Sequence, residues 1–162
     1  MTNFQNPLTL LVFYAHNIFN AKIDIFIFSA IILFVIHCFL VLTLARLFGW
    51  FVSSNTYSRR FRVSFILYAF VMFLIMLTHV VDLLFYAYML DGMGVFSDPI
   101  ASFYFAGEMY TTVGYGNYQL SPEWRGLPLV IAFSGIFAVS ISGAGLFNML
   151  HILLIERTKR GQ

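Results

Sequence analysis

The sequence carries very little charge. Asp, Glu, Lys and Arg together make up 10% of its 162 residues, whereas hydrophobic residues make up 60% and aromatic residues 19%. In soluble domains roughly a quarter of all residues are charged, so this composition excludes an ordinary soluble protein. The chain also has no room for a separate soluble domain of about 50 residues beside its apolar runs. We therefore expect one integral membrane domain over residues 1–162.

Cysteine and the signatures of enzymes are also scarce. The single cysteine, Cys38, lies within an apolar run and cannot form a disulfide inside the chain. We expect it to be a small packing residue. Nothing in the sequence resembles a hydrolase, a transferase or a phosphate-binding loop. We therefore expect no enzymatic activity, no organic cofactor and no small-molecule substrate.

Three apolar runs are long enough to cross a bilayer, which takes about 20 residues. They are Ile25–Phe48, Val63–Leu90 and Leu127–Ile155. Because backbone groups in lipid must be satisfied within the segment, we expect three transmembrane helices and an all-α membrane protein. Residues 1–22 place apolar and polar side chains at helical spacing, which predicts an amphipathic helix on the surface of the lipid bilayer.

The basic residues predict the orientation of these helices. One group surrounds the loop after the first run and the other follows the third run: Arg46, Arg59, Arg60 and Arg62, then Arg157, Lys159 and Arg160. Basic flanks favour the cytoplasmic side, so we expect an outer N-terminus and a cytoplasmic C-terminus. We interpret these arginines as topology signals and not as a nucleic-acid site. The expected location is the plasma membrane, or the inner membrane of a bacterium.

About 36 residues separate the second run from the third, and they are too polar to span. Ser97-Asp98-Pro99 predicts a helix start, because Asp98 can cap free amides and Pro99 suits the first helical position. We expect a short helix over Pro99–Tyr110. It should end at Thr112-Val113-Gly114-Tyr115-Gly116, where two glycines allow unusual backbone angles that turn successive carbonyls the same way. This suggests a carbonyl-lined ion path.

The segment Thr112–Gly116 resembles the selectivity filter of the potassium channel superfamily. Phe103-Tyr104-Phe105 stands where that family has aromatic pore-helix residues, and Trp124-Arg125 stands just before its inner helix. The resemblance covers roughly Pro99–Ile155. The layout is similar to small bacterial single-pore channels with an additional N-terminal transmembrane helix.

This resemblance implies a fold and a function. Residues 99–116 would be a re-entrant pore helix and filter, 63–90 the outer helix, 127–155 the inner helix and 25–48 a peripheral helix. Carbonyls of the filter would replace the hydration shell of transported K⁺, which binds at Thr112, Val113, Gly114 and Tyr115. One chain supplies one strand of such a filter, so a four-fold homotetramer is implied. Gating would come from pH, lipid or filter conformation.

The same carry-over implies supporting residues around the filter: Glu108, Thr111, Asn117, Tyr104 and Phe105. The family most often has aspartate where this chain has Asn117, so we predict a Glu108–Asn117 hydrogen bond. The alternative is that Glu108 faces water at the outer mouth. On the inner helix the carry-over places three residues toward the cavity and suggests three glycines as hinges: Phe137, Ser140 and Ala144, then Gly135, Gly143 and Gly145. Close packing explains each glycine equally well.

Three ionisable residues fall inside the apolar runs. His37 and His79 lie near mid-membrane, and Asp82 follows His79 by one helical turn. Such groups should face protein, either as a buried hydrogen-bonded network or as a proton sensor. They also suggest a second functional class, a membrane haem protein with His37 and His79 as axial ligands. A third class is a non-conducting, channel-like regulatory subunit.

Overall fold

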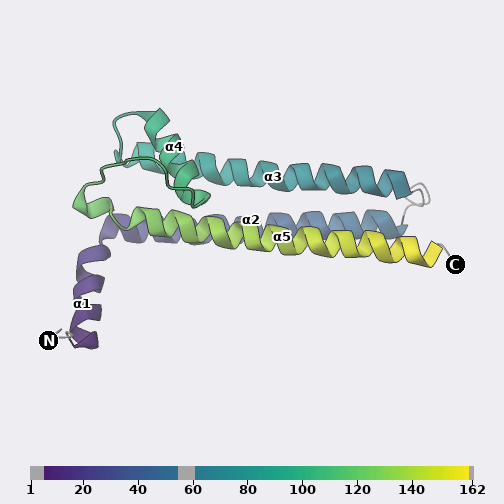
Figure 1. The fold of residues 1–162 in the computed structure, drawn as a ribbon, viewed down its shortest axis with the longest axis horizontal. Helices are drawn as coiled ribbons and strands as arrows, with labels where there is room; N and C mark the ends of the chain where they lie inside the picture. The colour runs from purple at the N-terminus through teal and green to yellow at the C-terminus, as the bar shows by residue number, and fades with distance from the viewer. Residues whose placement is uncertain (1–5, 55–60, 161–162) are drawn as a thin grey trace. The chain divides into compact units, whose positions relative to one another are not determined.

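The computed structural model describes residues 6–54 and 61–160. In this part of the chain every regular element is helical (Figure 1): α1 (Pro7–Ile18), α2 (Ala21–Ser54), α3 (Phe61–Gly92), α4 (Pro99–Tyr110), the 3₁₀ helix η2 (Pro122–Trp124) and α5 (Leu127–Arg160). Helices α2, α3 and α5 are long and apolar enough to cross a membrane. The predicted all-α membrane fold with three spanning helices is confirmed.

The long helices extend beyond the apolar runs that predict them. α2 begins at Ala21 instead of Ile25, and α5 continues beyond Ile155 to Arg160. No proline or glycine breaks the helix at these points, so it continues into more polar sequence. α4 has the predicted bounds, whereas α1 is shorter than the predicted segment 1–22. Residues 1–5 and the basic loop residues Arg59 and Arg60 lie outside the described residues.

Local capping explains where α1, α2 and α4 begin. Asn6 caps α1 by accepting a 3.1 Å hydrogen bond from Leu8 N, and Asp98 caps α4 with a 3.0 Å bond from Ile100 N. In both helices a proline occupies the first turn. Asn20 caps α2, because its Oδ1 accepts from the amides of Lys22 and Ile23 at 3.0 Å. A side-chain oxygen thus satisfies amides that have no partner within the helix.

The chain divides into two compact units. The first contains residues 1–32 and 86–135, and the second contains 33–85 and 136–162. In the first unit, Tyr86 lies among aromatic rings, 5.7 Å from the ring of Phe26 and 6.1 Å from that of Tyr110, and its hydroxyl donates to Ser134 Oγ at 2.5 Å. A Cβ at Gly135 would collide with the backbone carbonyl of Tyr110. The end of α4 therefore packs directly on the backbone of α5.

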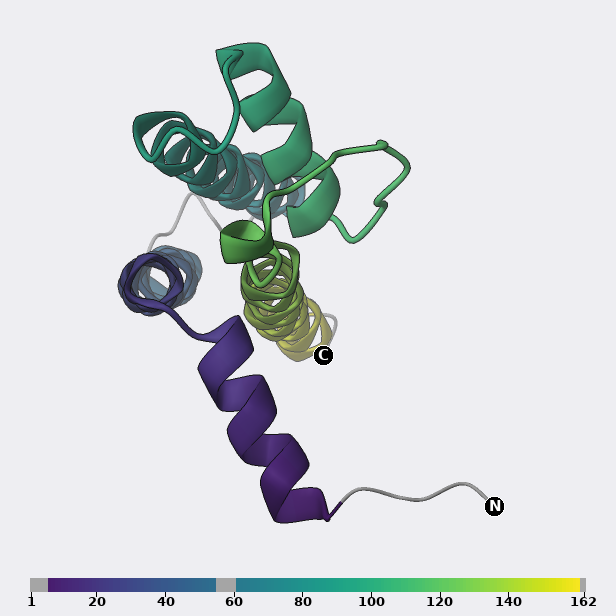
Figure 2. The same cartoon turned by 90° about the vertical axis from the view of Figure 1, so that its left-hand side faces the viewer.

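The first unit also joins the start of α2 to η2. Lys22 Nζ forms a 2.9 Å ion pair with Glu123 Oε2 and lies 4.9 Å from the centre of the Trp124 ring. Asn20 Nδ2 donates to the carbonyl of Glu123 at 2.9 Å. Figure 2 shows the extended segment after α4 returning to η2 and the start of α5. These contacts fix the far end of that segment.

In the second unit an apolar cluster holds α2, α3 and α5 together: Ala45, Phe48, Val52, Val71, Ile75, Met149 and Leu153. A Cβ at Gly145 would lie 2.8 Å from Val41 Cγ1, so this glycine allows α5 to approach α2 closely. Gly143 is different, because a Cβ there would meet nothing within 4 Å.

Candidate functional site

The site is built on the C-terminal end of α4. Thr112 N donates to Met109 O and Val113 N donates to Glu108 O, both at 3.0 Å. This pair of bonds is a Schellman motif, in which the residue after the helix cap takes left-handed backbone angles. That residue is Thr112, whose φ is +59°. It is the one non-glycine residue with positive φ in the described part of the chain.

The end of α3 provides an internal comparison. Gly94 N donates to Asp91 O at 2.9 Å, and Val95 N donates to Leu90 O at 3.0 Å, which is the same motif. Its left-handed residue is Gly94, with φ of +67°. Glycine takes this conformation without a steric penalty, whereas a β-branched residue such as threonine is strained there. The chain thus accepts strain at Thr112 that it avoids at Gly94.

Left-handed angles recur two residues further along. Gly114 has a φ of +57°, and a Cβ there would meet nothing within 4 Å, so the backbone angle alone favours glycine. Left-handed residues at every second position turn successive amides to one side of the strand and successive carbonyls to the other. The segment after α4 thus has left-handed residues at two alternate positions, Thr112 and Gly114, whereas Gly116 does not have a positive φ.

Glu108 holds this segment at both ends. Its backbone carbonyl accepts from Val113 N, as described above, and its buried side chain reaches the other end. There Oε2 accepts from Gly116 N at 2.6 Å, and Oε1 accepts from the Tyr118 hydroxyl at 2.9 Å. A Cβ at Gly116 would lie 2.6 Å from Glu108 Oε2 and would also collide with the Tyr118 ring. Only glycine at position 116 allows this contact.

Tyr118 is held in place by two other aromatic rings. Its ring meets Phe105 edge-on at 5.1 Å and Phe96 at 5.7 Å, and those two rings lie 5.1 Å apart. Burial, followed by the hydrogen bond to Glu108, raises the pKa of the Tyr118 phenol to about 12. Sequence reasoning missed Tyr118. Its contact with Glu108 depends on the chain reversing after α4, and no local pattern indicates that reversal.

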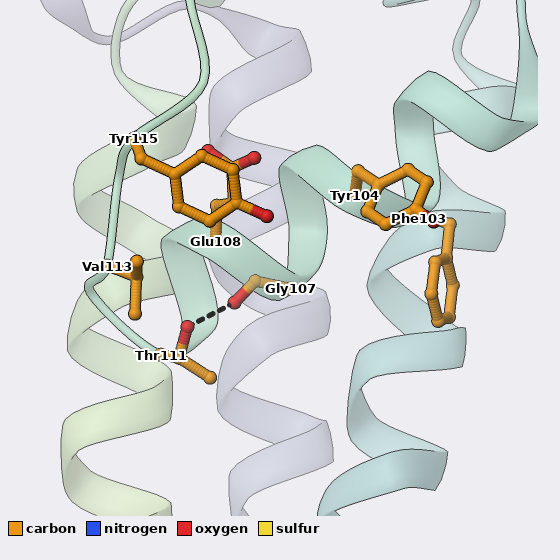
Figure 3. A pocket seen from close by; sticks show the side chains of 7 residues that line it. All are labelled: Phe103, Tyr104, Gly107, Glu108, Thr111, Val113 and Tyr115. Carbon is orange, nitrogen blue, oxygen red and sulfur yellow. Dashed lines mark hydrogen bonds between the residues drawn. The ribbon is translucent and has the colours of Figure 1, made fainter.

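The segment Thr112–Gly116 borders a pocket of about 250 Å³ (Figure 3). Its lining residues come from α4 and the segment itself: Phe103, Tyr104, Gly107, Glu108, Thr111, Val113 and Tyr115. Thr111 Oγ1 donates to the Gly107 carbonyl at 2.6 Å. The side chains of Val113 and Tyr115 are 61% and 76% exposed. A single chain leaves this apolar face uncovered.

The structure separates the residues expected to support the filter. Phe105 is buried against Tyr118, whereas Tyr104 is exposed in the pocket. Asn117 is exposed, and the predicted hydrogen bond between Asn117 and Glu108 is not formed among the described residues. The prediction was wrong in its partner: the carboxyl group contacts Gly116 and Tyr118, because both of its oxygens already have donors there.

The residues predicted to line a cavity lie along one side of α5. Phe137, Ser140 and Ala144 are exposed in the single chain. Phe137 lies 6.1 Å from Phe34, ring centre to ring centre, and Ser140 Oγ donates to the Ile136 carbonyl at 2.7 Å. Exposure in one chain leaves these positions available to a pore or to another copy of the chain.

The predicted group His37, His79 and Asp82 comes together in the second unit. His37 Nδ1 lies 2.7 Å from Asp82 Oδ2, and the two imidazole centres are 4.6 Å apart. Axial haem ligands bind from opposite faces of the macrocycle. Rings this close leave no space for a porphyrin between them, so the geometry argues against the haem alternative.

Residues 74–151 match the profile of a family described as "Ion channel". The matched segment contains α4, the segment Thr112–Gly116 and most of α5. This is consistent with a pore domain of the potassium channel superfamily. No curated protein and no solved structure matches the chain.

Proposed function

We propose that this chain, whose residues 74–151 match the profile of a family described as "Ion channel", forms a potassium-selective channel as a homotetramer. The observation that carries the proposal is the backbone of the TVGYG segment. Thr112 and Gly114 both have left-handed φ angles directly after a short helix, and such angles at alternate positions would turn the carbonyls to one side. This sequence in this conformation suits the replacement of a potassium hydration shell.

The electrostatics of α4 favour a cation at the same place. The C-terminal end of a helix carries a partial negative charge. α4 ends at Tyr110, two residues before Thr112. The Thr112 hydroxyl would add a further oxygen to the carbonyls of residues 112–115. We propose K⁺ as the transported ion bound along these four residues, and no organic cofactor.

The exposed aromatic face supports assembly from several copies. Tyr104 and Tyr115 are 55% and 76% exposed beside the pocket described above. One strand of carbonyls encloses no ion, so three further copies would be needed to complete a ring and to cover these side chains. Phe137, Ser140 and Ala144 would then face the central cavity.

The test is ion flux through liposomes that contain the purified protein. We expect passive K⁺ flux that is blocked by Ba²⁺ and exceeds Na⁺ flux by a large factor. Gly116→Ala should abolish the flux, because its Cβ would collide with Glu108 and Tyr118. Gly92→Ala is the matched control, since a Cβ there meets nothing within 4 Å.

The competing function is a channel-like subunit that does not conduct. A tetramer without flux, measured by mass in detergent and by the liposome assay, would establish that alternative. Equal K⁺ and Na⁺ flux would contradict the proposed selectivity, and a monomer in the bilayer would contradict the whole proposal. Accessibility labelling of Tyr14→Cys and His151→Cys would test the expected plasma-membrane orientation, with the first residue outside and the second in the cytoplasm.

A further inference from the structure

His37 has an unusual environment in the second unit. It is 1% exposed, its Nε2 lies 2.9 Å from Ser142 Oγ, and its Nδ1 lies 2.7 Å from Asp82 Oδ2. Nevertheless Nδ1 has no hydrogen bond of acceptable geometry among the described residues. An N–H at Nδ1 would not point at the carboxyl oxygen. Two buried polar atoms are therefore in contact without a well-placed proton between them.

A third polar side chain completes the group. His79 precedes Asp82 by three residues on α3, so the two side chains project from the same face of the helix. One nitrogen of each histidine and one oxygen of Asp82 all lie within 4.8 Å of one another. Facing helices build metal sites in helical bundles with this arrangement, in which two ligands come from positions i and i+3.

We propose that His37, His79 and Asp82 bind a divalent transition-metal cation of the zinc class. Zinc takes imidazole nitrogen and carboxylate oxygen at about 2.0–2.2 Å, so its ligand atoms lie roughly 3.3–3.5 Å apart. One ligand atom from each of the three residues lies within 4.8 Å of the other two, and His37 Nδ1 is 2.7 Å from Asp82 Oδ2, so side-chain rotation would be needed to reach that spacing. Imidazole ligands favour zinc, copper or nickel over magnesium or calcium.

A cation also explains the orientation at His37. A metal ion can accept the lone pairs of Nδ1 and Oδ2 from directions that a shared proton cannot use. With the His37 proton on Nε2, Ser142 Oγ accepts it at 2.9 Å from the other side of the ring, and the Nδ1 lone pair is then free for the metal. Metal-bound histidines usually have their second nitrogen held in this way. Ser142 is thus a positioning residue and not a ligand.

The energetics favour the same reading. Asp82 is 5% exposed within a membrane-spanning helix, where a carboxylate requires a compensating positive charge. A divalent cation bound to all three side chains would supply such a charge. It would join α2 to α3 within the second unit.

The experiment measures metal binding directly and requires no conduction. Tag-free protein is stripped with chelator and titrated with Zn²⁺, and bound zinc is counted per chain. We expect one zinc per chain, with affinity lowered at least about tenfold in His79→Ala and Asp82→Asn and more modestly in Ser142→Ala. His16→Ala and His151→Ala are the matched controls, since those histidines lie outside the cluster, and they should bind zinc as the wild type does.

Substitution with Co²⁺ guards against a variant that does not fold. Bound Co²⁺ should give the intense visible absorption of a low-coordinate nitrogen and oxygen site. His79→Cys should bind the metal again and add a sulfur-to-metal charge-transfer band. Wild-type protein that binds no zinc would overturn the proposal. So would zinc binding that is unchanged in His79→Ala or equally reduced in the His151→Ala control.

Discussion

Exchanging the two left-handed residues tests whether Thr112 is retained for its side chain. Both helix ends have the same pair of hydrogen bonds, with Thr112 at φ +59° in one and Gly94 at φ +67° in the other. If backbone geometry alone mattered, glycine would suit both positions. We therefore predict that Thr112→Gly makes the protein more stable and Gly94→Thr makes it less stable.

The magnitude follows from two opposing effects. A left-handed angle destabilises a residue that has a Cβ by about 1–2 kcal/mol. Glycine loses more backbone entropy on folding, which offsets about 0.5–1 kcal/mol of the gain. Thr112→Gly should therefore increase the free energy of unfolding by roughly 0.5–1 kcal/mol per chain. Gly94→Thr should decrease it by a similar amount, or about 2–4 °C in melting temperature per kcal/mol for a chain of this size.

The functional effect should have the opposite sign. Thr112→Gly removes the hydroxyl at the inner end of the proposed filter, so we expect a lower K⁺ to Na⁺ flux ratio in liposomes. Gly94→Thr should leave that ratio unchanged. Thermal unfolding in detergent measures the first effect and flux measures the second. The reasoning is refuted if Thr112→Gly destabilises the protein as much as Gly94→Thr does.

Three other predictions concern the contacts around the segment. The free energy of unfolding of the wild type should fall between pH 10 and 12, because the pKa of Tyr118 is raised to about 12 in the folded protein and the unfolded phenol deprotonates first. Melting curves of Tyr118→Phe should lack this alkaline transition. Gly135→Ala should destabilise the protein by about 1–3 kcal/mol through overpacking, whereas Gly143→Ala, with open space around it, should not. Glu123→Gln should lower stability by only about 0.2–1 kcal/mol in low salt, and by less in high salt, because its ion pair with Lys22 is half-exposed.

Local signals in the sequence predicted the main helices of this protein. The apolar length of three runs predicts α2, α3 and α5, since only a helix satisfies its backbone in lipid. Asp98 and Pro99 predict the start of α4 because capping involves neighbouring residues only. The two glycines of TVGYG predict unusual backbone angles, and Gly114 has a left-handed φ whereas Gly116 does not. The left-handed angle at Thr112 was not predicted, because intrinsic preference argues against it.

Contacts between residues far apart in the sequence could not be predicted from local patterns. The hydroxyl of Tyr118 reaches Glu108 across ten positions, and Gly135 packs on the carbonyl of Tyr110. Both depend on how the chain returns after α4. The sequence singled out Glu108, and its carboxyl group does contact the segment Thr112–Gly116, but the choice of Asn117 as partner assumed that the family's pairing is preserved. The packing of Tyr118 against Phe105 provides a different donor.

Glu108 also explains how the strain at Thr112 persists. Strained angles survive where the surrounding contacts over-determine them. Here the carbonyl of Glu108 fixes Val113, and its carboxyl group fixes Gly116 and Tyr118. A side-chain substitution removes only the second of these two anchors. A substitution of the Glu108 side chain should therefore affect mainly the end of the segment near Gly116 and Tyr118.

The choice of side chain at position 108 then gives a specific expectation. Glutamine can direct its oxygen to Gly116 N–H and its amide to the Tyr118 oxygen, because a hydroxyl both donates and accepts. Glu108→Gln should therefore change stability little. Glu108→Ala leaves the Gly116 amide without its acceptor, a loss of about 1–3 kcal/mol, and should speed inactivation in single-channel recordings. The double variant Glu108→Gln with Tyr118→Phe should fall between Glu108→Gln and Glu108→Ala, since phenylalanine offers the amide no acceptor but the glutamine oxygen still accepts from Gly116 N–H. If Glu108→Gln alone is as damaging as Glu108→Ala, the negative charge matters more than the hydrogen bonds.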